Sequence, residues 1–187
     1  MRMQKKWLFK VCPLFLTLFF SSTPHLANAE QTESSVLFSL INKRLSYMED
    51  VALYKYEKNI KVEDLDREQI VINEALEEAT EKDLDRTSIE NFFRTQIDIA
   101  KLIQYRYFAD WAQNPTNTTA PDLQNDIRPS LTNLGHSIIL ELVKLLRDKK
   151  GIKSEQRGLF HASITIAKVH SKDKDDLFDS LLLIKTQ

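Results

Sequence analysis

The chain has 187 residues, a single cysteine (Cys12) and a formal net charge of −1. One cysteine excludes a disulfide framework and a cysteine-ligated metal site. A near-neutral balance gives no overall electrostatic match to nucleic acid or an anionic membrane. Any site for an anion must therefore be a local concentration of arginine and lysine.

The first residues are typical of a secretory signal. Four basic residues at positions 2, 5, 6 and 10 precede the apolar run Val11–Phe20, and Ala27-Asn28-Ala29 supplies small residues. We predict a cleavable signal peptide over residues 1–29, and hence a periplasmic or secreted protein. A retained membrane anchor is the disfavoured alternative, because the apolar run is shorter than the ~20 residues that span a bilayer. Removing residues 1–29 leaves 22 basic and 27 acidic residues, a net charge of −5.

The remaining chain is predicted to be all-α. It has three glycines and long segments with a 3.6-residue apolar period, whereas a β-sandwich needs frequent turn residues. We predict one helical-bundle domain of about six helices over residues 30–187. Within it, residues 35–111 form the catalytic helices, 112–121 a linker and 122–187 a helical extension. The six helices are expected at about 35–57, 65–81, 87–111, 128–151, 154–169 and 173–184.

The first predicted helix carries two cations on or beside its apolar stripe. Arg44 and Lys55 are eleven residues apart, about three turns at ~100° per residue, so both point the same way, roughly 16 Å apart along the axis. Two cations facing a core require carboxylates or a bound anion to compensate them. The alternative is that both side chains extend to solvent at the edge of the stripe.

The next two helices place further polar groups near this pair. After an extended connector, Asp64 or Asp66 is expected to cap the second helix, with Gln69 completing a capping box on Asp66. Gln96 and Gln104 fall in the buried stripe of the third helix, where each amide must bond to the protein or face a ligand. The small Ala100, one turn before Gln104, leaves space for such a ligand.

The C-terminal half offers one candidate site residue. Arg128-Pro129 is expected to open the fourth helix, since proline is tolerated in a first turn. His161 and His170 have no partners at metal-ligand spacing apart from a solvated acidic run. The sequence contains no glycine-rich phosphate loop, GxSxG or HExxH motif. We therefore predict neither a metal nor a cofactor.

Taken together, these polar residues resemble the all-helical chorismate mutases, the AroQ class. The shared pattern is Arg44-x10-Lys55-x8-Asp64-x2-Arg67-Glu68, then Phe92-Phe93-x2-Gln96, then Ile103-Gln104-x6-Trp111. The signal peptide, the helical extension and Asp122-Leu123-x4-Arg128-Pro129 resemble the exported, gamma subclass. The resemblance covers about residues 37–111 and 122–134.

The resemblance implies an exported chorismate mutase that converts chorismate to prephenate by a Claisen rearrangement without a cofactor. It implies a homodimer that binds this small molecule, with no nucleic-acid partner and no stable membrane anchor. By similarity, the roles fall into three groups. Arg44 and Arg128 would bind the two carboxylates, with support from Arg67. Lys55 and Gln104 would donate to the ether oxygen. Asp64 and Glu68 would contact the substrate hydroxyl from two sides.

Three positions depart from some relatives. Val71 and Ala100 are expected to line the pocket where a glutamine and a hydroxyl residue can occur, and Gln104 stands where some exported members have glutamate. An amide at Gln104 predicts activity that is largely independent of pH near neutrality. Two alternatives stay open: an isochorismate-pyruvate lyase with similar cations, and a non-catalytic helical module that binds a dicarboxylate or a partner helix.

Overall fold

The computed structural model describes residues 25–148 and 151–187, with side chains described from residue 34 onward. Most of the predicted signal peptide lies outside the described residues. The described chain is helical, as predicted, and its elements follow one another in this order: α1 His25–Ser46, α2 Met48–Glu57, α3 Leu65–Glu81, α4 Arg86–Gln113, the π-helical turn η1 Leu123–Ile127, α5 Arg128–Arg147, the 3₁₀ turn η2 Ser154–Gln156, α6 Arg157–Ser163 and α7 Ser171–Leu182.

Local signals explain where the central helices begin. Asp64 caps α3 by accepting a hydrogen bond from the Arg67 N–H, and Asp85 caps α4 by accepting one from the Ser88 N–H. The predicted bounds of α3 are confirmed. The alternative capping box on Asp66 is wrong, because Asp66 lies inside the helix.

The first predicted helix ends at Glu57 as expected, but it differs from the structure at its start and in its middle. It begins at His25 rather than near residue 35, and it is interrupted at Tyr47, so one predicted helix becomes α1 and α2. The Ser46 hydroxyl donates to the Lys43 carbonyl at the interruption, a local bond that competes with the helical pattern. The predicted fifth helix is also too long, because α6 ends at Ser163.

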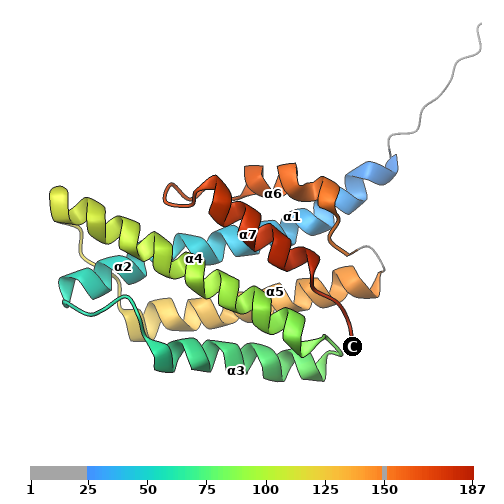
Figure 1. Ribbon diagram of the computed structural model, residues 1–187, viewed down its shortest axis with the longest axis horizontal. Helices are drawn as coiled ribbons and strands as arrows, with labels where there is room; N and C mark the ends of the chain where they lie inside the picture. The colour runs from blue at the N-terminus through green and yellow to red at the C-terminus, as the bar shows by residue number, and fades with distance from the viewer. Residues whose placement is uncertain (1–24, 149–150) are drawn as a thin grey trace, which may run out of the picture.

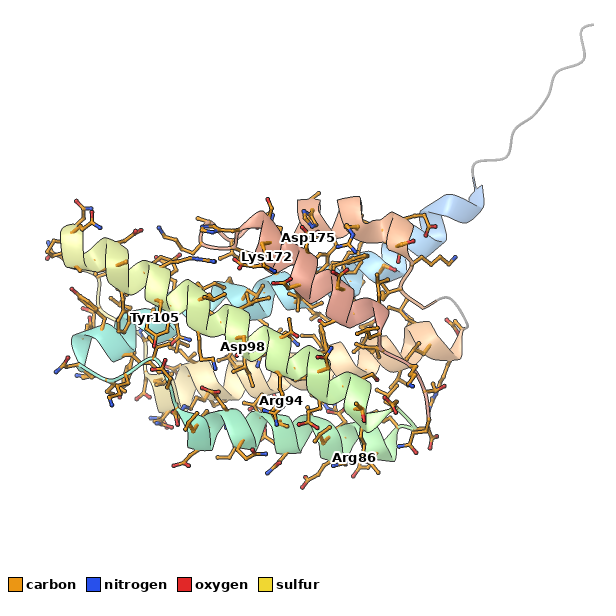
Figure 2. The ribbon with its side chains drawn as sticks, in the orientation of Figure 1. Arg86, Arg94, Asp98, Tyr105, Lys172 and Asp175 are labelled. Atoms are coloured by element: carbon orange, nitrogen blue, oxygen red, sulfur yellow. The ribbon has the colours of Figure 1, made fainter. Side chains whose placement is uncertain are left out.

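The helices pack around the long α4, which crosses the whole bundle (Figure 1). α2, α3 and α7 each pack against α4, and α5 contacts both α1 and α3. The outward face of α4 carries charged side chains such as Arg94 and Asp98 (Figure 2). None of the described helices is long and apolar enough to cross a membrane.

The C-terminal helices are joined to this frame by a buried aromatic cluster and an ion pair. Phe38 of α1 meets Phe160 of α6 edge to face at 5.1 Å, and Phe178 of α7 completes the cluster. Arg106 of α4 pairs with Asp173 at the start of α7. The extension thereby braces α1 and α4, the two helices that carry Arg44 and Gln104.

Candidate active site

A cavity of about 370 Å³ lies between α1, α2, α3, α4 and the start of α5. This volume is typical of a small-molecule site. Its walls are mixed: apolar side chains surround a group of polar and charged residues. The charged and amide side chains in its lining are Arg44, Lys55, Asp64, Arg67, Glu68, Glu74, Glu78, Lys101, Gln104, Arg128, Asn133 and His136.

The structure brings Arg44 and Lys55 into this cavity, and each is only 5% exposed. Burial, followed by the nearby charge of Arg67, lowers the pKa of Arg44 to about 10. The Arg44 Nε is buried without a hydrogen-bond partner among the described residues. Burial also lowers the pKa of Lys55, partly opposed by Asp64. The cavity therefore holds buried cations whose charge is incompletely compensated.

Lys55 is oriented by the connector between α2 and α3. Its Nζ donates to the Val62 carbonyl at 2.5 Å, and Val62 is itself a buried part of the cavity wall. An ammonium group has three N–H donors. The bond to Val62 thus fixes the direction of Lys55 and leaves further donors for a bound molecule.

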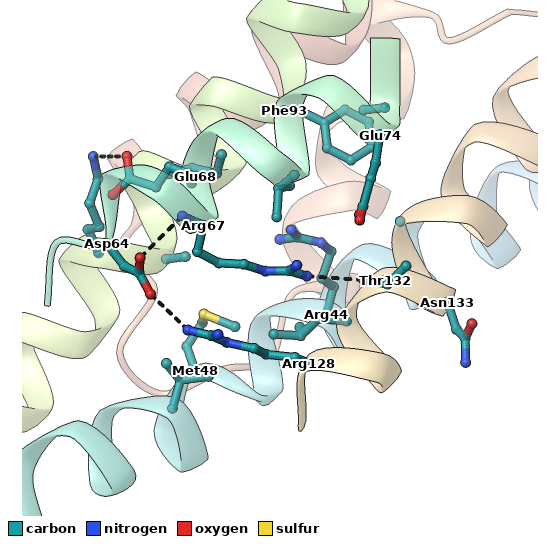
Figure 3. Close-up of a pocket in the computed structure, with 18 of the residues that line it drawn as sticks. Arg44, Met48, Asp64, Arg67, Glu68, Glu74, Phe93, Arg128, Thr132 and Asn133 are labelled. Atoms are coloured by element: carbon teal, nitrogen blue, oxygen red, sulfur yellow. Dashed lines mark hydrogen bonds and ion pairs between the residues drawn. The ribbon is translucent and has the colours of Figure 1, made fainter. Parts of the chain in front are cut away.

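Two more arginines lie side by side across the cavity (Figure 3). Arg128 Nη2 forms an ion pair with Asp64 Oδ2 at 2.8 Å, and Arg67 Nη2 donates to the Thr132 hydroxyl at 3.1 Å. Asp64 thus has two roles, as cap of α3 and as partner of Arg128. η1 helps to aim Arg128, because its buried Leu123 and Ile127 anchor the chain directly before α5.

Residues of α5 contact α3 at one-turn intervals. Arg128, Thr132 and His136 are four residues apart and therefore share one face of α5. Each faces a partner on or just before α3: Arg128 meets Asp64, Thr132 meets Arg67, and His136 Nδ1 lies 2.7 Å from an oxygen of Glu78. This row closes one side of the cavity.

Gln104 lies opposite, on α4, and is 4% exposed. Its Nε2 donates to the Ala100 carbonyl at 3.0 Å and lies 3.9 Å from the Met48 sulfur, a weak acceptor. Its Oε1 is buried without a hydrogen-bond partner among the described residues. An amide nitrogen has two N–H donors, so the one directed at the weak acceptor Met48 is available to a stronger acceptor on a ligand. Ala100 and Val71 lie in the apolar part of the wall.

Of the remaining polar candidates, one lies at the cavity and one does not. Glu68 lines the cavity and pairs with Lys101 at 3.2 Å through Oε2, whereas its Oε1 is buried and unbonded within the described part of the chain. Gln96 is fully buried but does not line the cavity. Its amide has no hydrogen-bond partner among the described residues, and we have no physical account of that.

The nine residues that the chorismate mutase resemblance assigned to the site therefore line one cavity. Sequence reasoning missed other lining residues, including Met48, Lys101, Thr132 and His136. Thr132 and His136 could have been found by continuing one turn at a time from Arg128, since i, i+4 and i+8 share a helix face.

The site defines a class of protein: an all-helical protein with a pocket whose buried cations suit an anionic ligand. Comparison with known proteins is more specific. The family described as chorismate mutase type II matches residues 35–105. A secreted chorismate mutase of Yersinia pestis is 35% identical over 146 residues, which cover 78% of each chain. A monofunctional chorismate mutase of Enterobacter agglomerans is 28% identical over 177 residues, covering 95% of this chain and 97% of the relative.

Solved structures agree with the sequence comparison. The crystal structure of the secreted chorismate mutase from Yersinia pestis has a TM-score of 0.74 at 33% identity, covering 81% of this chain and 97% of that one. This chain belongs to the chorismate mutase type II family.

Proposed function

We propose that this protein is an exported chorismate mutase that converts chorismate to prephenate without a cofactor. The observation that carries the proposal is the buried Arg44. Its Nε has no hydrogen-bond partner among the described residues, and the same cavity is lined by Arg67, Lys55 and Arg128. Chorismate is a dianion, and its charge would compensate these cations.

The rearrangement is intramolecular, so it needs no nucleophile or proton donor. Catalysis must come from holding the substrate in its compact, reactive conformer and from stabilising charge in the transition state. In this proposal, Arg44 and Arg128 bind the two carboxylates and Arg67 supports them. Guanidinium groups suit this task because they bind carboxylates through two parallel hydrogen bonds.

Negative charge grows on the ether oxygen as its C–O bond breaks. Lys55 and Gln104 are assigned as donors to that oxygen, because each has an N–H left over after its bond to a backbone carbonyl. Those carbonyl bonds also hold the two donors in place before the substrate binds. Donors arranged in advance inside a dry cavity contribute far more than donors in water.

The two carboxylates of the cavity are assigned to the substrate hydroxyl. Asp64 and Glu68 lie on the first turn of α3 or just before it, and Glu68 Oε1 is a buried acceptor without a partner in the described chain. A hydroxyl donor on the substrate would supply that partner. Ion pairs with Arg128 and Lys101 orient the two carboxylates.

We also propose export through cleavage after Ala29 and assembly as a homodimer. The relatives from Yersinia pestis and Mycolicibacterium smegmatis are named secreted chorismate mutases, and the N-terminal sequence has the order of a signal peptide. Mass spectrometry of the protein secreted or released from the periplasm would show whether it begins at Glu30. Sedimentation of that material would give its oligomeric state.

One assay separates the proposed activity from its alternatives. The purified protein is mixed with chorismate and, separately, with isochorismate, and substrate absorbance and released pyruvate are followed. Loss of chorismate without pyruvate is the expected result. Pyruvate release from isochorismate with no turnover of chorismate would instead indicate a lyase, and no turnover of either would indicate a binding module.

A further inference from the structure

We propose that Thr132 is a positioning residue for substrate binding: its hydroxyl holds the Arg67 guanidinium toward the bound carboxylates without neutralising its charge. This inference rests on the proposed function and adds a residue to it. The contact that carries it is the 3.1 Å hydrogen bond from Arg67 Nη2 to Thr132 Oγ1, between α3 and α5 (Figure 3).

Arg67 needs a partner because it shares the cavity with Arg44. The two charges repel, and after burial this repulsion is the second cause of the lowered pKa of Arg44. An arginine has several flexible torsions, and without a contact near its tip it would turn away from a like charge and into solvent. Thr132 lies at the cavity wall and gives the guanidinium a defined direction before the substrate arrives.

The chemistry of the partner matters as much as its place. Arg128, the neighbouring arginine, is held by the carboxylate of Asp64, which offsets part of its charge. A hydroxyl orients a cation through a dipole and leaves the full positive charge available. The cavity thus contains one arginine bound by an acid and one bound by a neutral acceptor, and the second keeps more attraction for a dianion.

Thr132 is suited to substitution because it is solvent-exposed and lies inside a regular helix. Thr132→Val keeps the shape and removes the acceptor, and the two residues have similar helix propensities. Thr132→Ser restores the hydroxyl. Ser137→Ala is the matched control. It removes a hydroxyl from α5 that, within the described part of the chain, donates to the Asn133 carbonyl of its own helix and does not line the cavity.

Steady-state kinetics with chorismate test the proposal. Thr132→Val is expected to raise KM about tenfold, the loss of one charge-assisted hydrogen bond. Its kcat should stay within about twofold, because the carboxylates are bound equally in ground and transition states. Thr132→Ser and Ser137→Ala should match the parent protein. Thr132→Asp, which would neutralise Arg67, should raise KM about thirtyfold or more, although a carboxylate would hold the guanidinium at least as firmly.

A double variant tests whether Thr132 acts through Arg67. In an Arg67→Met background, Thr132→Val should lower kcat/KM by less than about twofold, because its partner is already absent. A full tenfold further loss would overturn the proposal, since Thr132 would then act independently of Arg67. An unchanged KM in Thr132→Val, or a Thr132→Ser variant as impaired as Thr132→Val, would also overturn it. Failure of the parent protein to rearrange chorismate would refute the proposed function itself and is a separate result.

Discussion

Replacing Arg44 by methionine should stabilise the empty protein while removing most of its activity. Arg44 is 5% exposed, and its Nε lacks a hydrogen-bond partner among the described residues. Burying a charge under those conditions costs free energy that only a bound anion recovers. Methionine keeps an unbranched apolar side chain that adapts to an irregular site, so the change removes the charge with little loss of packing.

The lowered pKa gives the size of this cost. Burial and the neighbouring Arg67 bring the pKa of Arg44 to about 10, well below its ordinary value. At about 1.4 kcal/mol for each factor of ten, the folded state disfavours the charged form by about 3 kcal/mol. Because the folded-state pKa is the lower one, this penalty is complete at neutral pH and shrinks as the pH rises above about 10.

Thermal unfolding without ligand measures the effect. Allowing for some lost packing, Arg44→Met should gain about 1–3 kcal/mol, an increase in Tm of about 2–12 °C for a domain of this size. Its kcat/KM for chorismate should fall by about 10²–10⁴, the cost of leaving a bound carboxylate unpaired. Arg94→Met is the control, because Arg94 lies on the outward face of α4 in an exposed ion pair with Glu90 and should change Tm little. A lower Tm in Arg44→Met than in Arg94→Met would refute the reasoning.

Two further predictions concern pH. The kcat of the parent protein should vary little between pH 5 and 8, because the amide of Gln104 donates without titrating. Gln104→Glu should lose kcat as the pH rises, since only a protonated acid can donate. A steep loss of kcat in the parent protein would contradict this prediction. Burial raises the pKa of Asp173, but hydrogen bonds from Arg106 and the His170 N–H outweigh this effect. The pKa of Asp173 therefore lies below its usual value. The stability that Asp173 contributes is therefore present at neutral pH and is lost as the pH falls below about 4. Asp173→Asn should lower stability at pH 7 by about 1–3 kcal/mol, and a difference that persisted undiminished at pH 3 would refute the assignment.

The sequence predicted best the elements that are defined by local chemistry. α3 has its predicted bounds because Asp64 satisfies the first free N–H groups of the helix. α5 begins at Arg128 as expected, with Pro129 in its first turn. Arg44 and Lys55 reach the same cavity despite the interruption at Tyr47, where the backbone keeps right-handed helical dihedral angles.

The sequence failed where contacts between distant segments decide the structure. α6 ends at Ser163, six residues before the predicted end at Val169, because Lys174 of α7 donates to the carbonyls of His161 and Ile164. Thr132 could not be predicted for the same reason, because its contact with Arg67 joins two helices that are far apart in the sequence. Arg128 lines the cavity as predicted, but its ion pair with Asp64 became evident only from the structure.

The most direct test of the account is the kcat of Lys55→Met with chorismate. The central claim is that donors fixed beside the breaking C–O bond stabilise its developing charge, and Lys55 is the cationic one of the two. We predict a fall in kcat of about 10²–10³, with a Tm no lower than that of the parent protein, because Lys55 is another buried cation. A kcat within about threefold of the parent value, in a folded variant, would contradict the claim.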